Sequence, residues 1–205
     1  MPEQTVSDTR DRILKAAARL FSEASYDSVT VREIAKAVGI NPASIYYHFP
    51  SKEDILTTLY DCYTKERIAK SPELGMLLLL AEANPPHEVL MKSEFHYDEQ
   101  DVEFLDQILL TASRMLSADI KSEQFIRENI FGPVTNILKP LLVRMVDLGK
   151  IKPFDIDVFI GILHYYLFSA AALNKSPFHQ SVEDFQKAMS HIYSLIVPTQ
   201  LESKG

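Results

Sequence analysis

The chain has 205 residues, of which 46% are hydrophobic and 24% charged, a balance that is typical of globular proteins and excludes a fibrous or low-complexity chain. Its single cysteine, Cys62, excludes an intramolecular disulfide and a cysteine-rich metal site, and the lack of a long apolar run predicts a soluble, cytoplasmic protein without a membrane span. The net charge of −7 argues against extensive binding to nucleic acid, but residues 1–56 carry seven basic against eight acidic residues, which leaves room for a small DNA-binding surface.

The first two predicted helices follow from apolar spacing and from capping residues. Residues 8–24 place apolar side chains at the spacing of one helical face; they are Ile13, Leu14, Ala17, Ala18 and Phe21. A second, shorter helix is predicted after Thr30, because Glu33 lies three residues later and completes a capping box. Gly39 is placed to end this helix in a left-handed conformation.

A third and a fourth helix follow at once. Asn41 is predicted to cap the third, with Pro42 in its first turn and its end near His48. Ser51 and Asp54 predict the start of the longer fourth helix. Four helix starts within the first sixty residues predict a compact three-helix unit with a helix that leads out of it.

The rest of the chain is also predicted to be helical, and no segment shows the alternation of a strand. The predicted helices lie near residues 73–83, 86–92, 98–116, 121–149, 155–174 and 182–197, with kinks at Gly132-Pro133 and Pro140. The fold class is therefore all-α. We expect a helix-turn-helix DNA-binding domain over residues 1–56 and a helical bundle for ligand binding and dimerisation over residues 57–205.

The short helices joined by "VGIN" have the form of a helix-turn-helix, whose second helix faces the major groove with its N-terminal half. In this arrangement Ala43, Ser44 and Tyr47 point toward base edges. Tyr46 and His48 can donate hydrogen bonds to the flanking phosphates.

Ile45 and Phe49, four residues apart, are predicted to form the inward face of the same helix. The alternative is that Tyr46 and Tyr47 are ordinary packing residues, but so short a helix cannot bury all four side chains. At least one tyrosine is therefore expected to be exposed. Three other polar residues also have an interpretation that involves no DNA. Thr30 could serve only as a helix cap, and His48 and Lys52 could be ordinary solvated side chains.

The segment "TVREIAKAVGINPASIYYHFPSKEDIL" resembles the DNA-binding motif of the TetR family of transcriptional regulators, and the resemblance extends from about Arg10 to Leu59. It implies that Thr30 binds a phosphate and that Arg32 reaches a guanine edge or a phosphate. The resemblance further implies base contacts by Asn41, Ala43, Ser44 and Tyr47, and backbone contacts by Tyr46, His48 and Lys52.

Resemblance to this family also implies that the residues after Leu59 form a dimer and hold an inducer cavity. The apolar periodicity of the last two predicted helices indicates the dimer surface, with Phe159, Ile162, Leu163, Tyr166, Leu167, Ala170, Phe185, Met189, Ile192 and Ile196. Adaptable apolar residues are the pocket candidates, although each could be ordinary core: Phe104, Ile108, Met115, Phe125, Phe131, Met145 and Tyr165. These pocket candidates favour an apolar or aromatic effector, and the sequence does not exclude a cationic effector.

Two other classes of function were weighed against this hypothesis. An enzyme is disfavoured because no phosphate loop, nucleophile elbow or helical zinc motif occurs, and the residues His87, Glu94, His96 and Asp98 are more typical of a solvated loop than of a metal site. A helical small-molecule-binding or interaction protein without DNA binding is disfavoured by the intact motif. We therefore expect a homodimeric regulator, without cofactor or metal, that binds a palindromic operator and represses transcription until a ligand binds.

Overall fold

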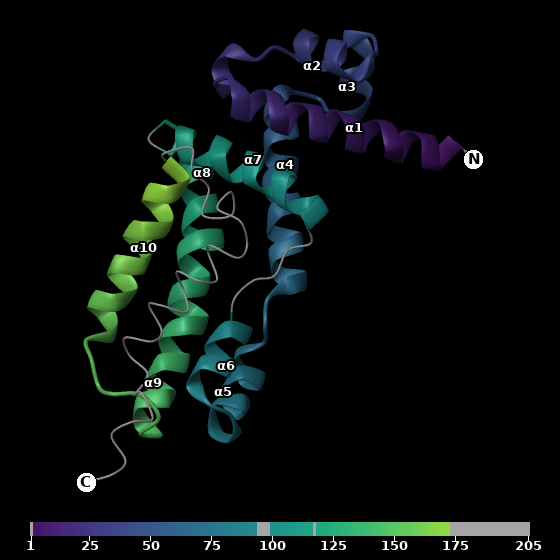
Figure 1. Cartoon of the computed structure of the whole chain (residues 1–205). Coiled ribbons are helices and arrows are strands. Elements are labelled where there is room, and N and C mark those ends of the chain that lie inside the picture. Colours follow the sequence, from purple (N-terminus) through teal and green to yellow (C-terminus); the bar gives the residue numbers. More distant parts are fainter. Residues whose placement is uncertain (1, 94–98, 117, 173–205) are drawn as a thin grey trace. The chain divides into compact units, whose positions relative to one another are not determined.

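The computed structural model describes the backbone of residues 2–93, 99–116 and 118–172, and the side chains of these residues except 2–7, 99–101 and 166–172. Every element of this part of the chain is a helix, as Figure 1 shows. The α-helices are α1 (Pro2–Glu23), α2 (Val31–Val38), α3 (Pro42–His48), α4 (Lys52–Lys70), α5 (Leu74–Ala83), α6 (Pro86–Lys92), α7 (Glu99–Met115), α8 (Ile120–Ile126), α9 (Lys139–Asp147) and α10 (Ile156–Ala172). A 3-10 turn η1 (Tyr26–Ser28) and two π-helical turns, η2 (Arg127–Phe131) and η3 (Val134–Leu138), complete them.

The chain divides into two compact units, which are described separately. Unit 1 comprises residues 1–66 and 98–126, and unit 2 comprises residues 67–97 and 127–205. We call α1, α2 and α3 the head. The domain boundary predicted between residues 56 and 57 stays a prediction.

In unit 1 the head closes over its own apolar core, and α7 packs against α1. The predicted stripe of α1 is buried, and so are the inward residues of α2, α3 and α4: Ile13, Ala17, Phe21, Ile34, Ala35, Ile45, Phe49, Ile55 and Leu59. Helix α1 begins at Pro2, upstream of the predicted start at residue 8. Proline in the first turn and Glu3 after it suit a helix N-terminus, which explains the longer helix.

In unit 2 a second core joins α5, α6, α9 and α10. Its fully buried residues include Leu77, Leu90, Leu141 and Leu142. Near Gly132-Pro133 the helix widens into the π-helical turns η2 and η3, because proline cannot donate the hydrogen bond that a regular α-helix needs. The kinks predicted at Gly132-Pro133 and Pro140 stay predictions. Among the described helices, none has the length and apolar character that crossing a bilayer demands.

Candidate nucleic-acid interface

The turn between α2 and α3 is built from the residues that the sequence singles out. Gly39 has φ +74°, and its N–H donates to the carbonyls of Ala35 and Lys36, which closes α2. The side-chain oxygen of Asn41 accepts a hydrogen bond from the N–H of Ala43 at 2.9 Å and so caps α3. Both capping predictions are confirmed, and the two helices form a helix-turn-helix.

Helix α3 has one buried face and one exposed face. Ile45 and Phe49 are each 1% exposed, whereas Tyr46 is 55% and Tyr47 79% exposed. The prediction that at least one tyrosine is exposed is therefore confirmed for both. The ring of Tyr47 meets that of His48 edge-on, with centroids 5.2 Å apart. Two large aromatic side chains with polar tips thus lie in water on a helix of seven residues, which suits contact with a polar partner.

The first turn of α3 presents small polar and apolar groups beside these tyrosines. Asn41, Ala43 and Ser44 are exposed. The side-chain oxygen of Asn41 is used by the cap, whereas its N–H₂ group is available to donate to a base or a phosphate. The predicted base-reading residues thus lie at the exposed N-terminal end of α3.

Thr30 and Glu33 form the capping box that the sequence predicts at the start of α2. The Thr30 N–H donates to Glu33 Oε2 at 2.7 Å and the Thr30 hydroxyl donates to the same oxygen at 2.8 Å. These bonds hold the pKa of the Glu33 carboxyl below its usual value. The N–H and the hydroxyl of Thr30 both donate to Glu33 in the free protein, and a phosphate contact by Thr30 stays a prediction.

Helix α2 carries two exposed basic residues beside the turn. Arg32 and Lys36 are both exposed and are four residues apart, so they share one side of the helix. Lys36 was not among the predicted DNA-binding residues, although its spacing of four residues from Arg32 on one helix is a signal in the sequence.

Other basic residues hold the head together. Arg12 Nη2 donates to the Val38 carbonyl at 2.6 Å, at the end of α2. Arg10 Nη1 donates to the His48 carbonyl at 3.1 Å, at the end of α3, and its guanidinium lies 4.3 Å from the centre of the Phe49 ring. Lys52, predicted to grip the DNA backbone, has Nζ 2.8 Å from the Tyr26 carbonyl and 3.0 Å from the Val29 carbonyl.

Comparison with known proteins agrees with this geometry. The family model described as "Bacterial regulatory proteins, tetR family" matches residues 13–59, which hold α2, the turn and α3. The chain therefore carries a TetR-family DNA-binding domain. Its N-terminal helices are thus the DNA-binding part of a transcriptional regulator.

Two curated relatives show how far the similarity extends. The biofilm operon icaADBC HTH-type negative transcriptional regulator IcaR of Staphylococcus aureus is 25% identical over 194 residues, which cover 91% of this chain and 96% of IcaR. The uncharacterized HTH-type transcriptional regulator YerO of Bacillus subtilis is 32% identical over 168 residues, covering 79% of this chain and 56% of YerO.

Solved structures show the same fold. A HlyIIR mutant protein superposes with a TM-score of 0.63 at 22% identity, covering 94% of this chain and 99% of the other. A putative TetR-family regulator from Mesorhizobium loti gives a TM-score of 0.58 at 16% identity, covering 94% and 98%. The TetR fold therefore extends beyond the residues that the family model matches.

The predicted pocket residues fall in both units of the chain. Phe104, Ile108, Met115 and Phe125 belong to unit 1, and Phe131, Met145 and Tyr165 to unit 2. In unit 1 Phe125 stacks on Tyr60, with centroids 4.3 Å apart. Ile108 and Met145 are fully buried in the cores, whereas Tyr165 is 76% exposed, which does not fit the lining of a pocket.

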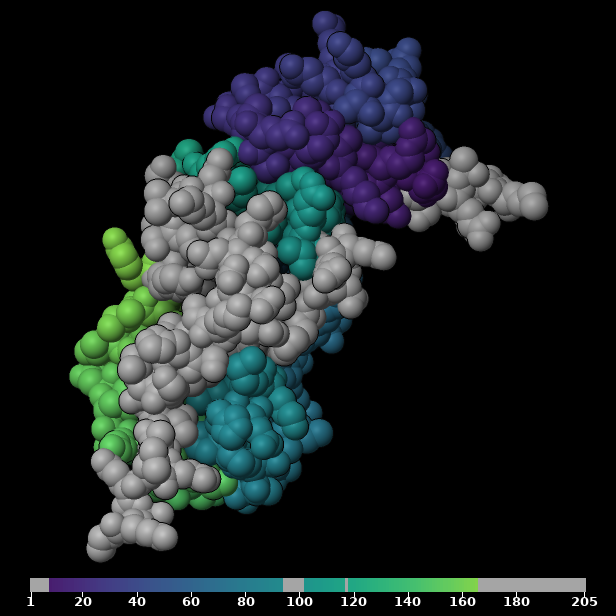
Figure 2. Space-filling view, in the orientation of Figure 1, coloured from purple at the N-terminus to yellow at the C-terminus, as the bar shows by residue number. Residues whose placement is uncertain are grey.

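The exposed face of α10 differs from the face that the sequence predicts for the dimer surface. Leu163 is only 4% exposed and packs in the core of unit 2 beside the half-buried Phe159, so it was wrongly assigned to the dimer surface. Ile162 is 62% exposed, and Val158 and Tyr165 lie on the same outward face; Figure 2 shows α10 in yellow-green along the left margin. The side chains of Tyr166, Leu167, Ala170, Phe185, Met189, Ile192 and Ile196 lie outside the described residues.

Metal ligands were considered at the loop before α7. Within the described ranges, no three His, Cys, Asp or Glu side chains lie together as a metal would require. Of the candidates considered, His87 is exposed at the start of α6. Glu94, His96 and Asp98 lie outside the described residues.

Proposed function

We propose that this protein is a ligand-responsive transcriptional repressor that binds a palindromic operator as a homodimer. The observation that carries the proposal is the division of α3 into a buried face, with Ile45 and Phe49, and an exposed face, with Tyr46 and Tyr47. Burial of one face fixes the rotation of the helix about its axis, and this leaves the opposite, exposed face available to the major groove.

Base recognition falls to the exposed N-terminal end of α3. The amide of Asn41 and the hydroxyl of Ser44 can bond to base edges, whereas Ala43 can contact only a thymine methyl group. Because these groups discriminate weakly, specificity rests on Tyr47, on Arg32 and on the shape of the DNA.

Phosphate contacts surround this reading surface. Tyr46 carries an exposed hydroxyl and His48 a half-buried ring, and both can donate to phosphate oxygens. Arg32 and Lys36 add two positive charges on α2. So small a basic surface agrees with the net charge of −7, because the electrostatic term comes from local contacts.

A homodimer supplies the second recognition helix. The outward apolar face of α10, with Val158, Ile162 and Tyr165, is the surface that we propose pairs with its copy across a twofold axis. Two heads held ~34 Å apart would match successive major grooves. That IcaR is named a negative regulator supports a repressor.

Release by an effector requires two conformations that bind it unequally. Helix α4 is the proposed lever, because it begins directly after the head and its Tyr60 and Tyr63 pack against Phe125 of α8. An apolar or aromatic effector is proposed from the pocket candidates. It would shift operator affinity by about 1 to 3 kcal/mol, the usual range of coupling between sites.

The decisive experiment captures genomic fragments with the purified protein and identifies the common sequence. We expect an inverted repeat that is bound by a dimer, with affinity that falls steeply as salt is added. Compounds are then screened for release of the bound fragment. A protein that binds no duplex better than random DNA at low salt would refute the proposal.

A further inference from the structure

Lys52, the first residue of α4, is half-buried and turned toward the protein. Its two hydrogen bonds go to the carbonyls of Tyr26 and Val29, at either end of the turn η1. Its ammonium lies 4.2 Å from the centre of the Tyr26 ring, a favourable cation–π distance. Lys52 thus joins the start of α4 to the turn that precedes α2.

We propose that Lys52 is a positioning residue for operator binding, which holds η1 and the start of α2 against α4 and does not neutralise a DNA phosphate. This inference rests on the proposed function, since it concerns binding to the same operator. It replaces the role that the sequence predicted for this lysine.

The consequence for DNA binding follows from the order of the chain. Val29 directly precedes Thr30, the residue that caps α2, and α2 packs against both α1 and α3. A shift of the Val29 carbonyl would therefore move the start of α2 and, through packing, the recognition helix. A misplacement of this kind weakens specific contacts because hydrogen bonds to base edges depend on position.

Tyr26 gives the lysine a fixed support. Its ring packs edge-on against the buried Phe21, with centroids 5.0 Å apart. Burial, with a further contribution from the Glu53 carboxylate, raises the pKa of Tyr26 to about 12. The phenol is therefore neutral at physiological pH and offers the ammonium a π face.

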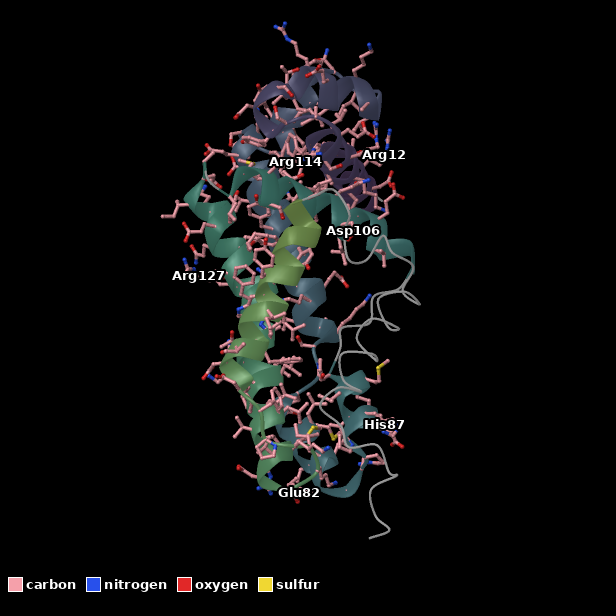
Figure 3. The ribbon with its side chains drawn as sticks, turned by 60° about the vertical axis from the view of Figure 1, so that its left-hand side comes forward. Arg12, Glu82, His87, Asp106, Arg114 and Arg127 are labelled. Carbon is pink, nitrogen blue, oxygen red and sulfur yellow. The ribbon has the colours of Figure 1, made fainter. Side chains whose placement is uncertain are left out.

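Other cations of unit 1 act in the same way. Arg10 and Arg12 bind carbonyls at the ends of α3 and α2, and Arg114 of α7 donates to the carbonyls of Ser22 and Ala24 at the end of α1. Figure 3 labels Arg12 and Arg114 near these helices. A cation is favourable at a helix C-terminus because carbonyls there lack partners. Lys52 extends this pattern to η1.

Salt dependence separates the two roles of Lys52. The affinity for the operator is measured over a range of salt for the intact protein and for the Lys52→Met and Lys52→Arg variants. Losing one phosphate contact in each subunit would lower the slope of log affinity against log salt by about 1.8 for the dimer. A positioning role predicts an affinity about tenfold lower for Lys52→Met, from the lost bonds to a charged donor, with an unchanged slope.

The Lys52→Arg variant is the matched control, because it keeps the charge and can still donate to both carbonyls. It is expected to recover most of the affinity. A slope reduced in Lys52→Met would overturn the proposal, and so would a folded Lys52→Met variant with unchanged affinity. If Lys52→Met does not fold, the salt slope is measured for Lys52→Gln, which has no charge but can still donate; a reduced slope would again overturn the proposal, and an unchanged slope would support it.

A second measurement needs no DNA and therefore separates failure of this inference from failure of the proposed function. Amide hydrogen exchange in the free protein should rise in Lys52→Met over residues 26–33 and stay unchanged in α10. Equal exchange in the two proteins would refute the positioning role even if operator binding is never observed.

Discussion

Helices α3 and α10 each present an exposed tyrosine on a helix whose opposite face is buried, yet their surroundings differ. Tyr47 is 79% exposed and Tyr165 76%. Tyr47 lies beside the ring of His48 and one helical turn after the polar Ser44, whereas Tyr165 shares its face with the apolar Ile162. A tyrosine among polar groups suits a wet nucleic-acid interface, and one among apolar groups suits a protein interface. The neighbours of an aromatic residue, more than its exposure, thus indicate its partner.

The largest effect is expected for Ile162→Glu, which tests the apolar side of this comparison. A carboxylate buried in the dimer interface would cost more than about 3 kcal/mol, so the protein should sediment as a monomer and lose operator binding. Val143→Glu is the control, because Val143 is an exposed apolar residue of α9. A dimer that persists in Ile162→Glu would place the interface elsewhere.

The two tyrosines themselves form a matched pair. Tyr47→Ala should weaken operator binding by about 1 to 3 kcal/mol and leave the dimer intact. Tyr165→Ala should weaken the dimer by about 2 kcal/mol, as loss of an interface aromatic residue does, without changing base preference. Fluorescence anisotropy with operator DNA and sedimentation equilibrium measure the two effects. If both variants affect the same readout equally, the assignment of the two faces is wrong.

Gly39 and Gly149 sharpen the comparison further, because they share a backbone conformation. Their φ angles are +74° and +66°, and an added Cβ would meet no atom within 4 Å in either case. Alanine at each should therefore lower the free energy of unfolding by about 1 to 2 kcal/mol through backbone strain alone, measured by urea denaturation. Only Gly39→Ala is expected to weaken operator binding as well, since Gly39 lies between α2 and α3.

The smallest effect concerns Glu33 at the start of α2. Its folded pKa is lower than the ordinary 4.5, so its bonds to Thr30 stabilise the fold above that pH and are lost as the pH falls through the folded pKa. NMR titration should show the Thr30 amide shifting in this acidic range, and Glu33→Gln should abolish the shift. At neutral pH Glu33→Gln should bind DNA slightly more tightly; weaker binding would mean that the carboxylate does not obstruct a phosphate.

Much of the head could be predicted because its signals are local. The caps at Thr30 and Asn41 and the left-handed Gly39 each depend on residues within a few positions. The exposed tyrosines followed from the same reasoning, since a short helix with Ile45 and Phe49 inward has no room for them.

The sequence could not predict the outward face of α10 or the direction of Lys52. Helix α10 is apolar on most sides, so periodicity does not distinguish Leu163, which is buried, from Ile162, which is exposed. That choice depends on packing against residues distant in the chain. An ammonium is attracted to backbone carbonyls and to phosphates alike, and only the fold places the carbonyls of Tyr26 and Val29 within its reach.

The π-helical turns η2 and η3 have a consequence for insertions and deletions. Such a turn is usually an α-helix with one residue added, which rotates everything beyond it by about 100°. His164 Nε2 lies 3.2 Å from the carbonyl of Phe131, an acceptor at the end of the first π turn. Removing one residue between Arg127 and Leu138 would convert a π turn into an α turn. We therefore expect this stretch to accept the gain or loss of single residues while the helix on each side keeps its packing.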